Sequence, residues 1–171
     1  GLGRYKTAAE GLETYGTSYP DREDAERVYF RAGEQWEAVS DRDALAFYDR
    51  YLKKYGTETN PNNALTAMAR RAELYNDQGN PRAYSRELDR ISETFDDLVA
   101  KGKPIGHAGH KYAAMAAYRD LEKDFQEVLN ELVDDPNMEK FRKEYEKMHR
   151  AWKTSYESEK RLVRRCKELN D

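Results

Sequence analysis

The sequence predicts an all-α protein, and three observations lead to this prediction. Helix-favouring Ala, Glu, Lys, Arg and Leu dominate the 171 residues, whereas Val and Ile are scarce. Turn-forming groups rich in Gly, Pro, Asn and Asp recur along the chain, and they separate segments whose apolar residues lie three or four positions apart. No segment alternates polar and apolar residues as a β-strand would. We therefore expect helices and no sheet.

The turn groups set the bounds of seven expected helices. In chain order these groups lie at 18–21, 40–41, 56–63, 78–81, 102–109 and 134–137. The helices expected between them span about 4–17, 22–38, 41–55, 62–78, 81–100, 110–133 and 137–169. The last helix is the longest, and its apolar seam slips near Ser155 before it returns at Leu162.

A recurring set of packing residues links the first five helices. One set reads Ala8-Leu12-Tyr15, Ala44-Tyr48-Tyr51 and Tyr84-Leu88-Ile91, followed four residues later by Tyr19, Tyr55 and Phe95. The helices between carry a second set, Tyr29-Ala32-Gly33-Trp36 and Met68-Arg71-Ala72-Tyr75. Because no pair of these helices can bury both faces alone, we expect neighbouring pairs to stack and complete the core.

At these residues the chain resembles the tetratricopeptide repeat (TPR) family. The resemblance rests on Tyr29-Gly33-Trp36 and Met68-Ala72-Tyr75, on the turn 78–80, on Ala8 and Ala44, and on Tyr19-Pro20. It covers about residues 4–100, as one half repeat and two full repeats. Arg71 stands where a leucine is usual, Tyr84 replaces an alanine, and the period exceeds the usual length of about 34 residues. The resemblance implies a solenoid of helical hairpins.

The long, tyrosine-rich repeats look most like those of bacterial cell-envelope proteins, including large repeat proteins linked to gliding motility. That narrower resemblance implies a periplasmic or cell-envelope location.

The repeat rhythm changes at residue 110. Apolar residues then follow a coiled-coil-like seam: Tyr118, Leu121, Phe125, Val128 and Leu132, and after the next turn Met138, Phe141, Tyr145, Met148 and Trp152. We predict TPR-like repeats over 1–100, a loop over 101–109, and a long antiparallel helical hairpin over 110–171. The hairpin belongs either to its own domain or to the same solenoid.

Metal, cofactor and catalytic chemistry have little support in the sequence. His107 and His110 could supply two metal ligands, but a zinc site needs at least a third, and the only cysteine, Cys166, lies far along the chain. His149 is expected to be a solvated surface residue. No catalytic or phosphate-binding motif is present. We predict no metal, no cofactor and no enzymatic activity.

The charge distribution argues against nucleic-acid binding and membrane insertion. The net charge is −3, and no apolar run approaches the roughly 20 residues of a membrane span. The basic cluster Lys160, Arg161, Arg164, Arg165 and Lys167 lacks interleaved aromatic residues. We interpret it as a solvated face or a protein contact.

A groove on the first helix of each hairpin is the candidate binding surface. Turning each helix away from its packed side exposes Arg27, Phe30, Arg31, Glu34, Thr66, Arg70, Glu73 and Asn76. Arg31 and Arg70 occupy equivalent places and could clamp a carboxylate of an acidic peptide or chain terminus. Alternatively, each arginine pairs with the glutamate three residues later, as is common on solvent-exposed helix surfaces.

The sequence thus predicts a non-enzymatic scaffold for protein–protein interaction, most simply a segment of a larger repeat protein that binds a peptide or protein partner in its groove. Two alternatives stay open. The C-terminal helices could form a coiled coil between copies of the chain, or His107 and His110 could bind a metal.

Overall fold

The computed structural model describes residues 2–133, 143, 145–151, 153–154 and 157, and in this part of the chain it is all-α. The helices are α1 (Leu2–Ser18), α2 (Ala25–Phe30), α3 (Ala32–Glu37), α4 (Asp41–Tyr55), α5 (Pro61–Asp77), α6 (Pro81–Ala100) and α7 (His107–Val133). Described residues between 143 and 157 are also helical. The predicted fold class is confirmed, and the predicted bounds of the first six helices hold to within a few residues, apart from one interruption.

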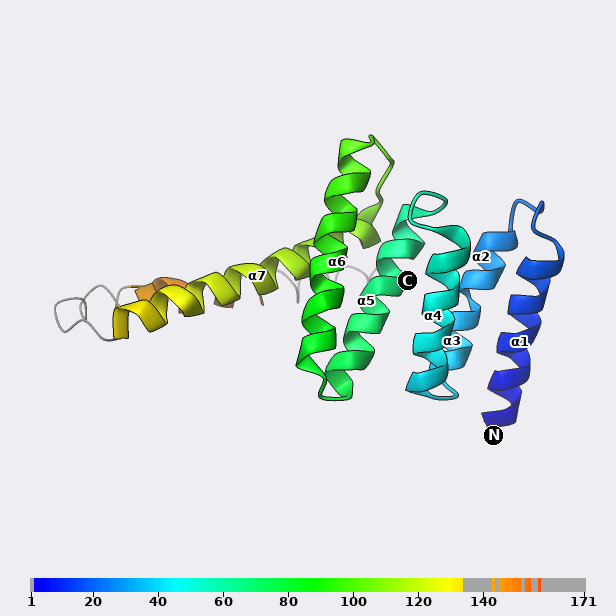
Figure 1. Ribbon diagram of the computed structural model, residues 1–171, viewed down its shortest axis with the longest axis horizontal. Helices are drawn as coiled ribbons and strands as arrows, with labels where there is room; N and C mark the ends of the chain where they lie inside the picture. The colour runs from blue at the N-terminus through cyan, green and yellow to red at the C-terminus, as the bar shows by residue number, and fades with distance from the viewer. Residues whose placement is uncertain (1, 134–142, 144, 152, 155–156, 158–171) are drawn as a thin grey trace. The chain divides into compact units, whose positions relative to one another are not determined.

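The chain divides into two compact units, Gly1–Tyr118 and Arg119–Asp171. In the first unit, α2 and α3 follow one another in the same direction, and α1, this α2–α3 segment, α4, α5 and α6 lie side by side, with the chain reversing direction from each to the next (Figure 1). The helix pairs with extensive contacts are neighbours, or next but one, in the chain. The core of the first unit therefore forms mainly between elements that are close in sequence.

Side-chain caps fix where α4, α5 and α6 begin. Ser40, Asn60 and Asn80 each precede a helix, and each accepts a hydrogen bond from the backbone N–H three residues later, at 3.1 to 3.2 Å. Pro61 and Pro81 occupy the first helical position, where the missing N–H costs nothing. These local signals explain why the sequence predicts the three starts well.

The expected single helix over 22–38 is wrong in detail. Helical backbone begins at Ala25 and is interrupted at Arg31, which separates α2 from α3. The interruption follows Val28-Tyr29-Phe30, three residues of low helix propensity, and it precedes Gly33. The weak local preference for helix accounts for the break.

An aromatic cluster forms the core between α2 and α4. The Tyr29 and Phe47 rings stack with centroids 5.4 Å apart, and Tyr55 meets Tyr29 edge-on at the same distance. The Phe30 ring packs edge-on against Tyr51 at 4.9 Å. Aromatic pairs in such geometries stabilise a core beyond the area that they bury.

Most predicted packing residues are buried: Tyr29, Ala32, Gly33, Trp36, Ala44, Tyr48, Tyr51, Met68, Arg71, Ala72, Leu88 and Ile91. Two predictions on the outermost helix are wrong. Ala8 is exposed and its neighbour Ala9 is fully buried, while Tyr19 is 55% exposed. α1 packs mainly on α2 and α3, with further bonds only from Arg50 and Tyr55 among the described residues of α4, so a smaller part of its surface is covered than in the inner helices.

Within the second unit, α7 pairs antiparallel with the described helical residues 145–151 and 153–154. Phe125 stacks on His149 with centroids 4.8 Å apart and meets Tyr145 at 4.9 Å, while Lys153 Nζ lies 2.8 Å from Glu122 Oε1. The expectation that His149 is solvated is wrong, because its ring covers Phe125. Most of the predicted last helix, including Cys166 and the basic cluster 160–167, lies outside the described residues.

Among the described helices, none combines the length and apolar character needed to cross a membrane.

Candidate functional site

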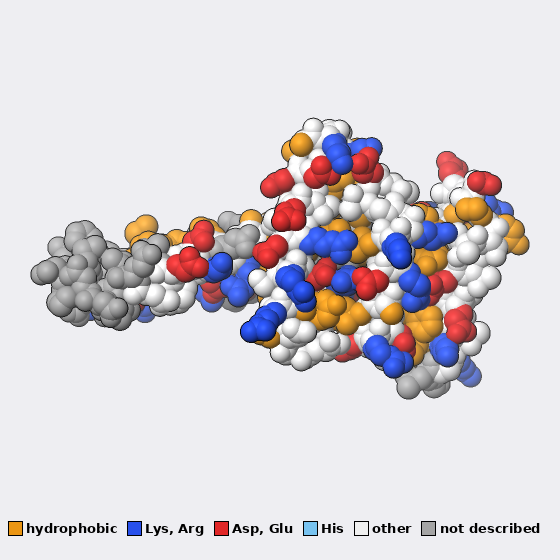
Figure 2. Space-filling model, in the orientation of Figure 1, with side chains coloured by type: hydrophobic (Ala, Val, Ile, Leu, Met, Phe, Trp, Pro, Cys, Tyr) orange, Lys and Arg blue, Asp and Glu red, His pale blue; other side chains and the backbone are white. Residues whose placement is uncertain are grey.

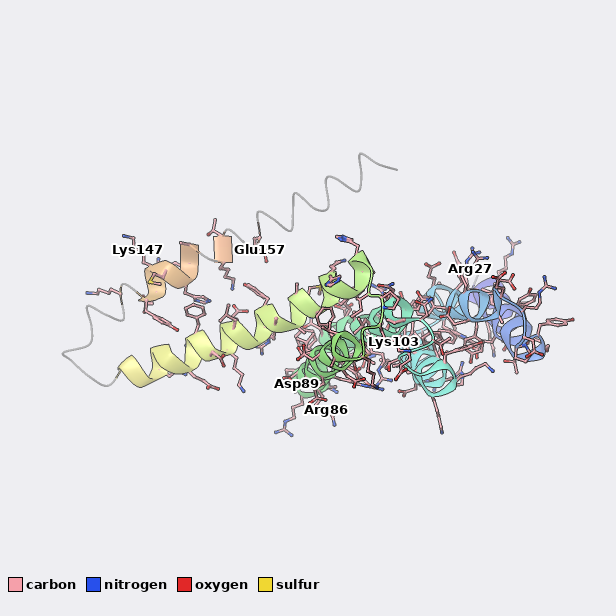
Figure 3. The ribbon with its side chains drawn as sticks, turned by 90° about the horizontal axis from the view of Figure 1, so that it is seen from above. Arg27, Arg86, Asp89, Lys103, Lys147 and Glu157 are labelled. Atoms are coloured by element: carbon pink, nitrogen blue, oxygen red, sulfur yellow. The ribbon has the colours of Figure 1, made fainter. Side chains whose placement is uncertain are left out.

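The predicted groove residues lie in two rows, one on α2 and α3 and one on α5. In the first row Arg27, Arg31 and Glu34 are exposed, whereas Phe30 is half-buried because it packs on Tyr51. In Figure 3, Arg27 lies on the opposite side of the first unit from Arg86 and Asp89 of α6. The face that carries Arg27 is thus separate from the outer face of α6.

In the second row, Thr66, Arg70 and Glu73 are half-buried and Asn76 is exposed. The Thr66 hydroxyl donates to the Asn62 carbonyl at 2.7 Å, so it is occupied within its own helix.

Arg70 is held by two carboxylates. Its Nε donates to Glu37 Oε1 of α3 at 2.9 Å, a second nitrogen contacts the other Glu37 oxygen, and a third pairs with Glu73 one turn along α5. Glu37 also accepts a hydrogen bond of 2.5 Å from the Tyr48 hydroxyl. The Arg70–Glu73 pair that the sequence offered as an alternative is confirmed. A guanidinium already shared by two carboxylates is poorly suited to clamp a third.

Arg31, in the equivalent place, is different. It is exposed, and it forms no ion pair with Glu34 or with any other residue that the structure describes. The two arginines therefore do not form a matched pair, and the predicted carboxylate clamp has only one free member.

Burial and hydrogen bonding set the electrostatics of this cluster. Burial alone raises the pKa of Glu37, but the hydrogen bonds from Arg70 and Tyr48 and the charge of Arg70 outweigh it, so the pKa of Glu37 lies below its ordinary value. Burial, and then the hydrogen bond to Glu37, raises the pKa of Tyr48. Glu37 is thus an anion held in place by two donors.

Two further carboxylates have the same role at other helix junctions. Glu13 of α1 accepts hydrogen bonds from Trp36 Nε1 at 2.5 Å, from the Tyr29 hydroxyl at 3.1 Å and from Arg50 Nη2 at 2.7 Å. Burial, followed by the charge of Glu13, raises the pKa of Tyr29 to about 12.

Glu26 of α2 accepts from the Tyr51 hydroxyl, from Asn60 at 3.0 Å and from Asn63 at 2.9 Å. Neither Glu13 nor Glu26 was predicted from the sequence as a site residue. The signal that could have found them is the row of buried tyrosines, whose hydroxyls need acceptors.

Arg71 joins α4, α5 and α6. It is 7% exposed, and its guanidinium pairs with Asp49 and, at 2.9 Å, with Glu87 Oε1, which is itself buried. Arg71 stands where a leucine is usual in the repeat, and a carboxylate on each flanking helix neutralises its buried positive charge. Together with the three glutamate clusters, this triad joins α1 to α2 and α3, α3 to α4, α4 to α5, and α5 to α6. In Figure 2, Lys and Arg side chains lie next to Asp and Glu side chains on the displayed face of the first unit.

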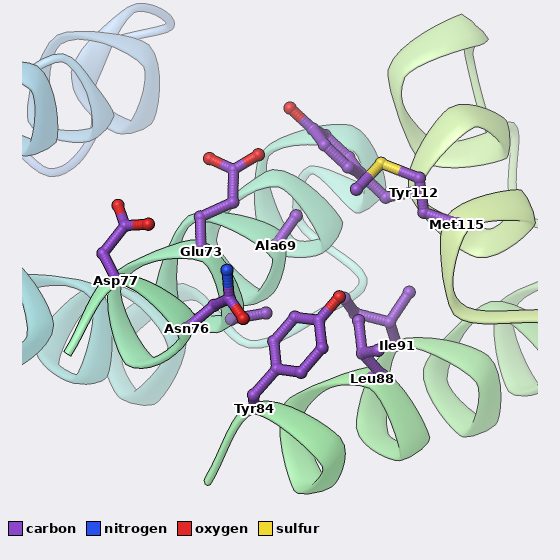
Figure 4. A pocket seen from close by; sticks show the side chains of 10 residues that line it. Ala69, Glu73, Asn76, Asp77, Tyr84, Leu88, Ile91, Tyr112 and Met115 are labelled. Carbon is purple, nitrogen blue, oxygen red and sulfur yellow. The ribbon is translucent and has the colours of Figure 1, made fainter. Parts of the chain in front are cut away.

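A pocket of about 340 Å³ lies where α5 and α6 meet the first turns of α7. Its lining residues are Ala69, Ala72, Glu73, Asn76, Asp77, Tyr84, Leu88, Ile91, Tyr112 and Met115. Figure 4 shows Glu73, Asn76 and Asp77 along α5, with Tyr84 from α6 and Tyr112 and Met115 from α7 standing across from them. Two predicted groove residues, Glu73 and Asn76, therefore line it. The other eight were not predicted as site residues.

The polar wall of the pocket is acidic. Asp77 is exposed and forms no ion pair with any described residue, while Glu73 shares Arg70 with Glu37. Burial, and then the negative charge of Glu73, raises the pKa of Tyr112. The negative charge of Asp77, which no described residue pairs, thus lies beside the apolar lining residues of the pocket.

The histidines that could have bound a metal do not converge. The His110 ring meets Phe95 edge-on at 5.2 Å, and His107 is exposed at the start of α7. The described part of the chain contains no group of three His, Cys, Asp or Glu side chains placed to hold a metal ion.

Part of the chain is similar to proteins of known name. It is 61% identical over 54 residues to cilia- and flagella-associated protein 58 of mouse, a match that covers 32% of this chain and 6% of the relative. It is 48% identical over 62 residues to the human protein of the same name, covering 36% and 7%. The chain therefore matches only a small part of the length of these relatives. No protein-family model and no solved structure matches the chain.

Both relatives come from animals and are named for cilia and flagella. They give no support to the resemblance to bacterial cell-envelope repeats, and they neither support nor oppose the resemblance to tetratricopeptide repeats.

Proposed function

We propose that this chain is part of a non-enzymatic scaffold that binds other proteins in cilia or flagella, and that its first unit is a TPR-like module that supplies the binding surface. The observation that carries the proposal is the contrast between a cross-linked interior and an open face. Charged clusters tie α1 to α6 together, while Arg27, Arg31 and Glu34 stay exposed and form no ion pairs with described residues. The similarity to cilia- and flagella-associated protein 58 supports the location.

A fixed framework favours binding, because less conformational entropy is lost when a partner docks on a preorganised surface. The exposed side chains of α2 and α3 then provide recognition, and the ion pairs behind them keep the helices in register. Repeat proteins bind partners in this way without chemistry of their own.

The test is capture of partners from ciliated mouse cells by the tagged chain, together with its localisation. The test variant is Arg27→Glu/Arg31→Glu. The matched control is Arg86→Glu/Arg90→Glu, two exposed arginines one turn apart on α6. Both variants should keep the parent's circular dichroism and melting temperature. We expect the parent and the control to retain a ciliary protein that the test variant loses.

Exclusion of the parent chain from the cilium, or failure to capture any ciliary protein, would overturn the proposal. Equal capture by both variants, with a mass that rises with concentration, would assign the function to self-association of the C-terminal helices instead. In the second unit Leu121 and Met148 are 40% and 63% exposed, which is the observation that favours this second candidate.

A further inference from the structure

The pocket between α5, α6 and the start of α7 has the properties of a docking site for a helix. Its floor is apolar and comes from side chains at helical spacing on two adjacent helices, Ala69 and Ala72 on α5 and Leu88 and Ile91 on α6. A groove between two packed helices accepts the ridge of a third. In the first unit the groove is filled only in part, by Tyr112 and Met115 of α7, and about 340 Å³ is left open.

Asp77 indicates the charge of the occupant. It is the last residue of α5, and an acidic side chain at a helix C-terminus is unfavourable because it faces the negative end of the helix dipole. No described cation pairs with it. A cationic partner would relieve this repulsion.

The other charged groups near the pocket also leave its polar wall with a net negative charge. Glu73 and Glu37 share the single guanidinium of Arg70, and Lys111 lies 5.0 Å from the Tyr112 ring. The described residues that line the pocket include two carboxylates, Asp77 and Glu73, and no lysine or arginine. The wall is therefore net negative beside an apolar floor.

We infer that this pocket binds a basic amphipathic helix of a partner protein, with an apolar side chain on the floor and a lysine or arginine one turn away beside Asp77 and Glu73. This inference rests on the proposed scaffold function and specifies the chemistry of its partner. The pocket is a separate surface from the α2–α3 face, and neither Arg31 nor Arg70 lines it.

The test measures binding of a fluorescent, alanine-based helical peptide that carries leucine and arginine four residues apart, using the full chain and fluorescence anisotropy. The matched peptide has glutamate in place of arginine. Three protein variants are compared: Asp77→Asn removes the unpaired charge, Asn76→Trp fills the pocket from an exposed position, and Asp89→Asn removes a carboxylate on the outer face of α6 (Figure 3).

We expect the arginine peptide to bind the parent and Asp89→Asn equally and to bind Asp77→Asn about threefold to fivefold more weakly at low salt. Asn76→Trp should abolish binding, and the glutamate peptide should bind none of the proteins detectably. Added salt should reduce the difference between the parent and Asp77→Asn.

Undetectable binding of the arginine peptide, an unchanged affinity in Asn76→Trp, or equal binding of both peptides would overturn the inference. The inference would also be overturned if the mass of the parent rose with its concentration and the mass of Asn76→Trp did not, because a second copy of the chain would then occupy the pocket. These failures leave the proposed function intact if the chain still captures ciliary proteins. Conversely, peptide binding without capture of ciliary proteins would refute only the proposed function.

Discussion

The α2–α3 segment and α5 carry the same packing pattern 39 residues apart, yet their equivalent residues pack against the neighbouring helices in different ways. In α3, Ala32 and Gly33 are small and buried, and Tyr48 lies directly against Gly33. In α5 the equivalent residues are Arg71 and Ala72, and Arg71 is buried in a charged triad. At these equivalent positions α3 makes a close approach to α4, whereas α5 places a buried ion-pair triad there. Equivalent positions in a repeat do not have to share an energetic role.

Of the substitutions considered, Arg71→Leu should cause the largest loss of stability. Glu87 would then be a buried carboxylate without its partner, so we expect a loss of about 3–5 kcal/mol in the free energy of unfolding. Urea unfolding followed by circular dichroism measures it. The double variant Arg71→Leu/Glu87→Leu should recover most of the loss, because a well-packed apolar pair can replace a buried ion pair. If the double variant is as unstable as the single one, the triad contributes packing and not charge compensation.

Gly33→Ala tests the close approach in α3. An added Cβ would lie 2.8 Å from Tyr48 Cε1 and Oη, and that ring is buried and bonded to Glu37. We expect a loss of about 1–3 kcal/mol, despite the gain of about 1 kcal/mol in helix propensity. Gly11→Ala is the matched control, because a Cβ there meets nothing within 4 Å and should stabilise α1. Thermal melting of both variants decides between the two effects, and a more stable Gly33→Ala would disprove the tight contact.

Replacing each of the two arginines of the predicted groove should change the free energy of unfolding by different amounts. Arg70→Gln breaks the contacts to Glu37 and Glu73, and because the Arg70 side chain is 39% exposed we expect a loss of only about 1 kcal/mol. Arg31→Gln should change stability by less than about 0.5 kcal/mol, as is usual for exposed positions. Equal losses in urea unfolding would show that Arg31 has a structural partner in solution.

The smallest expected effect is the response to acid. The pKa of Glu37 is lower in the folded chain than its ordinary value of 4.5, so its contribution to stability is present above that pH and is lost as the pH falls through the folded pKa. Glu37→Gln should therefore flatten the fall in unfolding midpoint below pH 4.5, whereas Glu34→Gln, at an exposed site, should leave it unchanged. A parallel fall in all three proteins would contradict the assignment.

Local signals account for what the sequence predicts well. Ser40, Asn60 and Asn80 determine three helix starts through contacts three residues away. The repeat spacing likewise predicts most of the buried residues, because a helix turns by a constant angle per residue.

The charged clusters could not be predicted in the same way. Glu13 and Arg50 are 37 residues apart, and Glu37 and Arg70 are 33 apart. Whether such side chains meet depends on the angle and distance between helices, which the spacing within one helix does not specify. For the same reason the pocket residues of α6 and α7 were missed, although Glu73 and Asn76 of α5 were found.

The order of helix contacts bears on how the first unit would respond to mechanical force. Since the extensive contacts of α1 to α6 join elements close in the chain, tension applied at the two ends of this unit would load one helix junction after another. An ion pair or a tyrosine–carboxylate bond lies between α1 and α2, between α3 and α4, between α4 and α5, and between α5 and α6, and it must break before the next helix is released. The first unit would therefore lengthen in steps as it unfolds under tension.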